Sequence, residues 1–487
     1  MRLTISQPLG PLHGDLLIPS SKYHAHRALI LGSLAKGTTT IHGLSDARHV
    51  SFTLGALAAL GTKVTTSHGT SQGTWKVEGG QYSPVKGRVP FGSSGTTSYF
   101  LTPLACLADR PVVVDGQSYL RNRPVGPLLE ALRTLGVELE ASPGEKLPIA
   151  IQPGRPRGGH VKIKGTLSQW ISGLLILAPF CREKTTIEVV GELNEQPYVQ
   201  LTVEMMEQFG LHVNVLDNWQ RFEIEPGQEP HATEITLPAD VGSAVFGIAA
   251  AALHPSDVRF IGLTESTDHP EGGIYRVLRE MNVPLVFDES TRIAQLAQRS
   301  PELRGTEVDC REMPDMLPIL SVLGSFAHGR TVLRNVNHVR LKESDRVEAM
   351  LQLAKMGARI HVEGDSLICE GDATLAGRTL SSFNDHRVLM SLSIAGSRAS
   401  GLTAITYPHA YRISYPEYLE AMTSIGIPMT APGFTPRHFE GAYPAYAAAA
   451  AAREPLETAA REGTRATDPV EAHAPATAGS KGGGSRT

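Results

Sequence analysis

Apolar and polar positions along the chain repeat one pattern. A run rich in β-branched residues is followed by a loop, an amphipathic helical stretch, a Gly or Asn, and another apolar run. The pattern occurs in six segments, 37–64, 110–139, 184–213, 256–286, 329–360 and 401–429. Apolar residues three or four apart predict the helices, and alternation predicts the strands. The sequence therefore predicts a mixed α/β fold of six similar supersecondary units.

The spacing of the helix ends supports a structural period. The residues that end the six helical stretches are Gly61, Gly136, Gly210, Asn282, Gly357 and Gly426, separated by 75, 74, 72, 75 and 69 residues. Gly and Asn tolerate the left-handed conformation that closes many helices. A unit of this length exceeds a solenoid repeat, so we expect several strands in each copy and three units in each of two domains. Residues 1–19 precede the first unit and are predicted to form a strand that pairs elsewhere.

Composition excludes several classes of protein. The chain has 487 residues, 41% of them hydrophobic, so each of two or three domains has enough apolar residues for a core. Its net charge of −4 gives no reason to expect a nucleic-acid partner. Neither an 18-residue apolar run nor a signal-peptide core is present, which predicts a cytoplasmic protein without a membrane span. Four scattered cysteines favour neither a disulfide framework nor a zinc site.

The C-terminal stretch differs from the rest of the chain. Residues 437–487 are rich in Ala, Gly, Thr and Pro and contain few large apolar side chains. Such a composition cannot bury enough surface to offset the entropy of ordering. We expect a disordered tail there and assign it no function.

Polar side chains gather in loops that precede apolar helices. In "PSSKYHAHRALILGSLA", Lys22 and Arg27 follow a Ser pair at a predicted helix N-terminus, which is suited to an anion. The loop "FGSSGTTSYF" contains Gly95 and offers N–H and hydroxyl groups to an anion. In "YLRNRPVG", Arg123 provides a guanidinium that can grip a carboxylate or phosphate. Each motif alone is equally compatible with an ordinary cap or turn.

The second half of the chain adds acids to this inventory. Asp315 lies in "MPDMLPIL", Glu343 in "VRLKESDRVEAM", and His386 and Arg387 in "FNDHRVLMSLSIAG". A helix cap and a surface charge cluster are the alternative interpretations. Taken together, many cations, a few carboxylates and no reactive Cys suit a small, multiply anionic substrate and general acid–base chemistry.

The order of the motifs resembles that of the 5-enolpyruvylshikimate-3-phosphate synthases. The shared motifs are "PSSK", "RALILGSLA", "GSSGTT", "RNRPVGPLLEAL", "LSQW", "QPY", "PD", "LKESDR" and "FNDHR", and the resemblance extends from residue 1 to about 430. It implies a two-domain fold with three βαβαββ units per domain, each domain an inverse α/β barrel. The chain would cross between domains near residues 19 and 238. The first lobe would be 20–237 and the second 1–19 plus 238–432.

The resemblance also implies a reaction. The family transfers the enolpyruvyl group of phosphoenolpyruvate to a hydroxyl: the methylene gains a proton, the hydroxyl oxygen attacks C2, and the resulting ketal loses phosphate. No metal or organic cofactor is implied. Positions that match catalytic residues are Asp315, Glu343 and Lys22. Positions that match the phosphoenolpyruvate site are Lys22, Gly95, Arg123, Gln169, Arg346 and Arg387. Positions assigned to the acceptor are Tyr23, Arg27, Ser168, Gln169, Tyr198, Asp315, His338 and Lys342.

Departures from the family pattern concentrate on the acceptor side. A family serine is Tyr23 here, a phosphate-binding serine is Glu195, and an asparagine is His338. A C-terminal lysine is replaced by Ile413, with Arg412 beside it as a possible substitute. A carboxylate at 195 would repel a phosphate in the same place. The rings of Tyr23, Tyr99, Trp170 and Tyr198 could face a base, although core packing is the alternative.

These departures favour UMP, attacked through its 3′-hydroxyl in nucleoside-antibiotic biosynthesis, as the acceptor. A shikimate-3-phosphate enzyme with drifted contacts is the first alternative. A UDP-N-acetylglucosamine enolpyruvyl transferase is disfavoured, because "YLRNRPVG" lacks the loop Cys of that family. A non-catalytic binding paralogue fits the loss of the lysine but not the presence of Asp315 and Glu343. The acceptor and the oligomeric state stay open.

Overall fold

The computed structural model of the chain describes residues 1–66, 73–265 and 267–434, and the predicted tail at 437–487 lies outside them. The described residues form six four-stranded sheets. Each sheet contains one parallel pair of strands, and its other neighbouring pairs are antiparallel. This shared topology confirms the prediction of six similar α/β units. No helix in the described ranges is long and apolar enough to cross a membrane.

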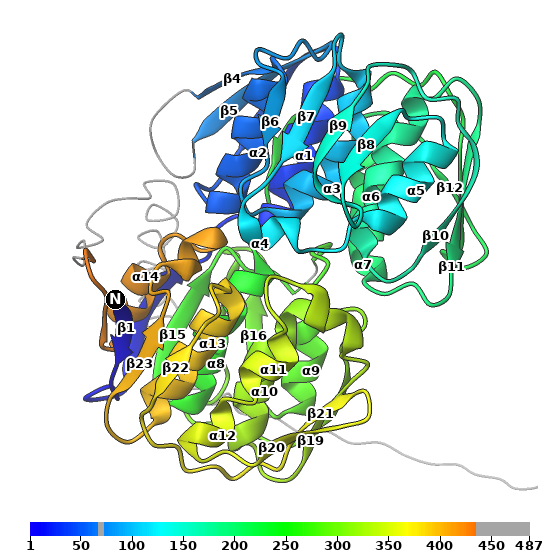
Figure 1. Cartoon of the computed structure of the whole chain (residues 1–487). Helices are drawn as coiled ribbons and strands as arrows, with labels where there is room; N and C mark the ends of the chain where they lie inside the picture. Colours follow the sequence, from blue (N-terminus) through cyan, green and yellow to red (C-terminus); the bar gives the residue numbers. More distant parts are fainter. Residues whose placement is uncertain (67–72, 266, 435–487) are drawn as a thin grey trace, which may run out of the picture. The chain divides into compact units, whose positions relative to one another are not determined.

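Three sheets come mainly from residues 20–237, which we call the first lobe (Figure 1). The first has the order β14 (Glu234–Thr236), β3 (Gly37–His42), β5 (Thr74–Gly79), β4 (Lys63–Thr66). The second has the order β6 (Arg88–Pro90), β7 (Val112–Asp115), β9 (Lys146–Ile151), β8 (Leu139–Ser142). The third has the order β10 (Gly159–Lys164), β11 (Thr185–Val190), β13 (Arg221–Ile224), β12 (Asn214–Leu216).

The other three sheets use residues 1–19 and 238–432, the second lobe. The first has the order β16 (Leu285–Asp288), β17 (Ile293–Leu296), β15 (Ser256–Ile261), β2 (Leu12–Leu17). The second has the order β18 (Glu307–Asp309), β19 (Thr331–Arg334), β21 (Ser366–Cys369), β20 (Ile360–Glu363). The third has the order β22 (Thr379–Ser381), β23 (Thr403–Thr406), β1 (Arg2–Ile5), β24 (Met429–Thr430).

Each unit contains one helix that is buried along most of its length. These inner helices are α1 (Lys22–Leu34), α3 (Gly95–Leu104), α6 (Ser168–Leu177), α8 (Val241–Leu253), α10 (Leu317–Phe326) and α13 (His386–Arg398). Most other helices have a mixed pattern of buried and exposed residues: α2 (Arg48–Ala59), α4 (Ser118–Arg121), α5 (Gly126–Thr134), α7 (Gln196–Gln208), α9 (Ile274–Glu280), α11 (Arg346–Met350), α12 (Leu353–Met356) and α14 (Tyr418–Ser424). The inner helices are buried nearly all round, although α1 and α13 begin with charged and polar side chains.

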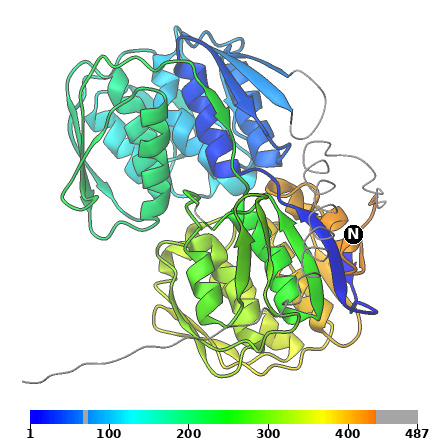
Figure 2. The ribbon, with the colours of Figure 1, turned by 180° about the vertical axis from the view of Figure 1, so that it is seen from behind.

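Strands distant in sequence complete the sheets. The N-terminal residues form two strands, where the sequence predicted one. Strand β1 lies between β23 and β24, beside the orange β23 in Figure 1, and β2 runs parallel to β15. In return, β14 runs parallel to β3, so that a green segment lies among blue ones in Figure 2. The chain passes from one lobe to the other twice. The two passing segments meet at an isolated antiparallel bridge between Ser20 and Ala239.

The buried apolar side chains form two separate clusters. One runs from Tyr23 to Leu237, and the other combines Leu3 to Ile18 with Val241 to Met429. Each cluster contains the inner helices of one lobe, so each lobe has its own core.

The six predicted helix ends share one backbone conformation. Gly61, Gly136, Gly210, Gly357 and Gly426 all have positive φ, between 78° and 114°, and Asn282 has φ 62°. At Gly61 a Cβ atom would also overlap the carbonyl oxygen of Ser83. Asn282 tolerates this conformation, and its amide nitrogen donates to Glu302 O at 2.8 Å. The predicted period is therefore a repeat of left-handed helix closures.

Candidate active site

The predicted site residues gather at the beginnings of the inner helices. Lys22, Gly95 and Ser168 are the first residues of α1, α3 and α6, and His386 is the first residue of α13. Asp315 lies in a 3-10 turn, η3 (Pro314–Met316), directly before α10. Helix N-termini carry unpaired N–H groups and partial positive charge, which favour bound anions.

One pocket contains most of these side chains. Its lining comes from both lobes: Lys22, Tyr23, His26, Arg27, His49, Thr96, Phe100, Arg123, Ser168, Gln169, Glu195, Tyr198, Asp315, Lys342 and Glu343. Arg346 and Arg387 lie behind Asp315 and contact its carboxylate. Thus both predicted groups of residues, for phosphoenolpyruvate and for the acceptor, meet around one space.

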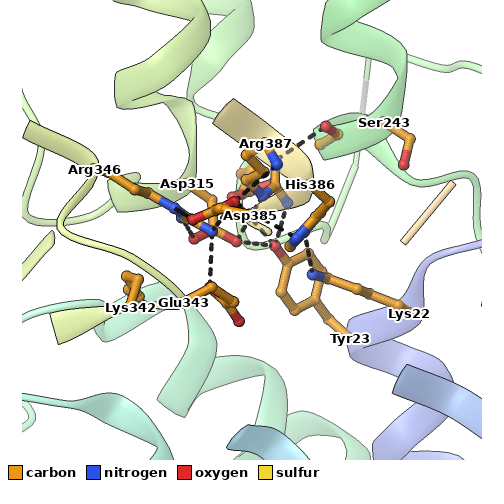
Figure 3. A network of polar contacts seen from close by, with 12 residues as sticks. Lys22, Tyr23, Ser243, Asp315, Lys342, Glu343, Arg346, Asp385, His386 and Arg387 are labelled. Atoms are coloured by element: carbon orange, nitrogen blue, oxygen red, sulfur yellow. Dashed lines mark hydrogen bonds and ion pairs between the residues drawn. The ribbon is translucent and has the colours of Figure 1, made fainter. Parts of the chain in front are cut away.

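Arg346 is the centre of the acidic network. It is fully buried, and its guanidinium binds Asp315 at 2.6 Å, Glu343 at 2.9 Å and Asp385 at 2.8 Å (Figure 3). Three carboxylates use nearly all donors of this one side chain, so its planar fork fixes their relative positions.

The neighbouring cations keep Asp315 and Glu343 ionised. Burial would raise the pKa of Asp315, but Arg387 and then Arg346 outweigh it and hold this pKa well below the usual range. The pKa of Glu343 is lowered in the same way, with burial opposed by Arg123 and Arg346. Both buried carboxylates are therefore in the charged form, the form in which a carboxyl group can accept a proton.

Lys22 and His386 form a second pair on the wall of the site. The ammonium Nζ lies 3.4 Å from Nε2 of His386. Burial, followed by the charge of Arg387, lowers the pKa of Lys22. Burial and the charge of Lys22 hold the pKa of His386 well below its usual value. His386 is therefore neutral, and Lys22 is a cation whose proton is easier to release than that of a free lysine.

Gly95 and Arg123 fit against each other. A Cβ atom at Gly95 would overlap Nη1 of Arg123. That Nη1 also lies 3.4 Å from Glu343. The glycine therefore lets a buried guanidinium lie directly at the N-terminus of α3, where an anion would meet both.

Tyr23 fills the space beside Asp315. Its hydroxyl donates to Asp315 Oδ2 at 2.5 Å and accepts from Arg387 Nη2 at 2.5 Å. Its ring packs edge-on against Tyr198 at 5.2 Å between centroids. The Tyr198 hydroxyl donates to Glu271 at 2.7 Å. Both rings line the pocket, so the residue at position 23 contributes directly to the wall of the candidate site.

Ser168, Glu195 and Lys342 form a third cluster. Glu195 accepts hydrogen bonds from the Ser168 backbone N–H at 3.2 Å and from the Ser168 hydroxyl, and it forms an ion pair with Lys342. His338 is buried near this carboxylate, and its Nε2 has no hydrogen-bond partner among the described residues. Gln169 donates to Thr96 at 2.8 Å, and its Oε1 forms no hydrogen bond within the same ranges.

Several predicted features lie elsewhere. All three guanidinium nitrogens of Arg27 bind protein atoms, namely Thr202 Oγ1 and the carbonyl oxygens of Tyr23 and Tyr198, although Arg27 also lines the pocket. Tyr99 and Trp170 pack in the core of the first lobe, so the interpretation of their rings as ligand faces is wrong. Arg412 is exposed, contacts Tyr411 and does not line the pocket.

Sequence reasoning gave no role to three buried groups. Glu271 approaches Tyr23, Tyr198 and Arg387 from a loop that carries no motif. Asp385 stands out in "FNDHR", directly before His386 and Arg387, and the structure shows that it contacts Arg346. His49 lines the pocket, 3.5 Å from Ser93, and burial lowers its pKa to about 3. Within the described ranges no group of three His, Cys, Asp or Glu side chains could hold a metal.

Comparison with known proteins agrees with this arrangement. The sequence model of the family described as EPSP synthase (3-phosphoshikimate 1-carboxyvinyltransferase) matches residues 6–422. The 3-phosphoshikimate 1-carboxyvinyltransferase of Methanococcus aeolicus is 34% identical over 429 residues, 86% of this chain and 98% of the relative. The enzyme of the same name from Methanocaldococcus jannaschii is 33% identical over 431 residues, 88% of this chain and 99% of the relative.

Solved structures share the fold. EPSP synthase from Acinetobacter baumannii matches with a TM-score of 0.74 and 24% identity, covering 88% of this chain and all of that one. The enolpyruvyl transferase NikO from Streptomyces tendae matches with a TM-score of 0.71 and 18% identity, covering 88% of this chain and 98% of that one. At these identities the likeness establishes the two-domain α/β fold.

Proposed function

The chain belongs to the EPSP synthase family and is an enolpyruvyl transferase, and from this premise we propose that it transfers the enolpyruvyl group of phosphoenolpyruvate to 3-phosphoshikimate. Two curated relatives that align over almost their whole length carry this acceptor in their names. They favour the shikimate alternative over UMP as the acceptor. NikO supports no acceptor, because at 18% identity it shares only the fold.

The geometry around Arg346 carries the proposed mechanism. Asp315 and Glu343 contact the same buried guanidinium, and both are held ionised. We assign to Asp315 the proton of the acceptor hydroxyl, because Tyr23 shows that a hydroxyl can donate to this carboxylate. The hydroxyl oxygen then attacks C2 of phosphoenolpyruvate.

Lys22 and Glu343 are assigned to the methylene carbon. Lys22 is the available proton donor, since its pKa is lowered and both carboxylates are already ionised. It gives a proton to C3 as the tetrahedral ketal forms. Glu343 removes a proton from the new methyl group while the C2–O bond to phosphate breaks, which restores the double bond. We assign to Arg123, which lines the pocket, the balance of the substrates' negative charge, and Arg387 adds positive charge from behind Asp315.

A second candidate acceptor is UMP. The observation that favours it is Glu195, whose carboxylate occupies donors on Ser168 and Lys342 that an acceptor phosphate would use. An acceptor that carries its phosphate elsewhere would avoid this contact.

The test is release of inorganic phosphate from phosphoenolpyruvate by the purified protein. 3-Phosphoshikimate, UMP and buffer are compared in parallel, and the product is identified by mass. We expect release with 3-phosphoshikimate only. Release with UMP alone would replace the first candidate by the second, and no release with either would refute both acceptors.

A further inference from the structure

The donors around Glu195 have the composition of an anion-binding site. They are a backbone N–H and a hydroxyl from Ser168, at the N-terminus of the ten-residue α6, and the ammonium of Lys342. Ser168 and Glu195 are each 1% exposed. A helix N-terminus combined with a cation binds anions well, and here the anion is a side chain of the protein itself.

Glu195 reaches this place from an unusual position. It is the N-cap residue of α7, with φ 61°, yet its carboxylate accepts no hydrogen bond from the first turn of that helix. Its side chain turns instead to the start of α6, while its own N–H donates to Arg311 O at 2.8 Å. The Glu195 carboxylate therefore forms no hydrogen bond to the N–H groups at the start of its own helix. It binds the donors of Ser168 and Lys342, which line the pocket.

The cluster also joins the two lobes. Ser168 and Glu195 belong to the first lobe, and Lys342 belongs to the second. Burial would raise the pKa of Glu195, but Lys342 and His338 outweigh it and lower this pKa, so the carboxylate is ionised. An ionised carboxylate satisfies the lysine in the absence of any ligand.

We propose that Glu195 occupies the anion subsite at Ser168 and Lys342, competes there with the phosphate of the acceptor, and thereby determines acceptor specificity. This rests on the proposed function in one respect, that the acceptor is phosphorylated. A phosphate can bind these donors only if the carboxylate leaves them, because two anions at one ammonium repel each other. A phosphorylated acceptor therefore binds more weakly than the donor set alone would allow.

The experiment compares Glu195→Ser and Glu195→Gln with the wild-type protein. Serine removes the carboxylate and leaves the space open, while glutamine removes the charge and keeps the size. Glu192→Gln is the matched control, since Glu192 lies in the same loop but is exposed and paired with Arg311 at 2.8 Å. KM for 3-phosphoshikimate, KM for phosphoenolpyruvate and kcat are measured for each protein.

We expect Glu195→Ser to lower KM for 3-phosphoshikimate at least 10-fold, with a smaller decrease for Glu195→Gln. KM for phosphoenolpyruvate should change less than 3-fold, and the control should match wild type. An unchanged or higher KM for 3-phosphoshikimate in both Glu195 variants would overturn the proposal.

A second readout does not depend on turnover. Binding of inorganic phosphate is measured by calorimetry with saturating phosphoenolpyruvate, which fills the other phosphate position. Glu195→Ser should bind phosphate at least 10-fold more tightly than wild type and Glu192→Gln. If no protein turns over 3-phosphoshikimate but this gain appears, the acceptor assignment fails and the role of Glu195 stands. Equal phosphate binding in all proteins refutes the role of Glu195, and if Glu195→Ser does not fold, Glu195→Gln decides by the same criterion.

Discussion

The hydroxyl of Tyr23 lies 2.5 Å from the carboxylate of Asp315, although the two residues are 292 positions apart in the chain. Tyr23 comes from the first lobe and Asp315 from the second, so this hydrogen bond joins the lobes inside the site. The phenol uses the same carboxylate oxygen that also binds Nε of Arg387, at 3.0 Å. An acceptor hydroxyl that is to give its proton to Asp315 must therefore displace Tyr23 or approach the other oxygen.

Replacement of Tyr23 by Phe tests this competition. The ring keeps its packing against Tyr198, but the hydrogen bond to a charged group is lost, which costs about 1.5–3 kcal/mol. We expect the free energy of unfolding to fall by about that amount, while kcat/KM for the acceptor rises several-fold. Chemical denaturation and steady-state kinetics measure the two effects. If turnover instead becomes slower by about two orders of magnitude with KM unchanged, the phenol itself transfers a proton.

Asp315→Asn and Glu343→Gln test the proton transfers. Each variant keeps the shape of its side chain but removes its ability to accept a proton. We expect kcat to fall by about 10²-fold or more in each, with KM for phosphoenolpyruvate nearly unchanged. Glu312→Gln, an exposed acid three residues before Asp315, is the control and should behave as wild type. Full activity in both variants would refute the assignment.

Arg346→Met tests the centre of the acidic network. The change removes the guanidinium that pairs with Asp315, Glu343 and Asp385, while the three carboxylates stay buried. Removing one partner from a buried ion pair costs about 3–5 kcal/mol, so we expect a stability loss of at least that size and no measurable turnover. Scanning calorimetry measures the loss. Arg340→Met, which breaks a partly exposed pair with Asp345, should cost less than about 1 kcal/mol.

Glu271 gives the protein a pH-dependent stability. Burial, opposed in part by Arg387, raises the pKa of Glu271 to about 7 in the folded state, from about 4.3 in an unfolded chain. A raised carboxyl pKa stabilises the folded state fully below the unfolded pKa, and this stabilisation is lost as pH rises through about 7. The upper limit is roughly 4 kcal/mol, at about 1.4 kcal/mol per pKa unit.

Thermal unfolding of wild type and Glu271→Gln between pH 5 and pH 8.5 measures this effect. The stability of the wild type relative to the variant should decrease across that range, because glutamine does not ionise. Glu265→Gln removes an exposed acid of the same region and should show no such trend. Parallel curves for wild type and Glu271→Gln would show that Glu271 keeps one charge state across the range.

Part of the fold and of the site could be predicted from residues that are close together in the sequence. A Gly or Asn at each helix end encodes the left-handed closure, because that conformation depends on a single residue and its neighbours. Lys22 was predicted at a helix start and lies there, because the Ser pair before it and the apolar run after it are local signals. Arg123 was predicted to grip an anion, and its side chain lines the pocket.

Contacts between residues that are far apart in the chain could not be predicted from local sequence. Glu271 has no motif, and its importance comes only from meeting Tyr23, Tyr198 and Arg387. Glu195 looked like a charge that repels phosphate, but the sequence did not reveal that Lys342, 147 residues away, already satisfies it. Tyr99 and Tyr23 looked alike as aromatic candidates, and both belong to the apolar cluster of the first lobe, but of the two Tyr23 also lines the pocket.

The sequence by itself determined the repeat, the helix closures and the set of charged residues, because each depends on neighbours within a few positions. Tertiary structure alone decided which carboxylate meets which cation, that residues 1–19 form two strands paired with β23, β24 and β15, and that Tyr23 binds Asp315. The reason is physical: the charge state and partner of a buried group depend on the atoms packed around it, and the packing of the two lobes brings those atoms from distant parts of the chain.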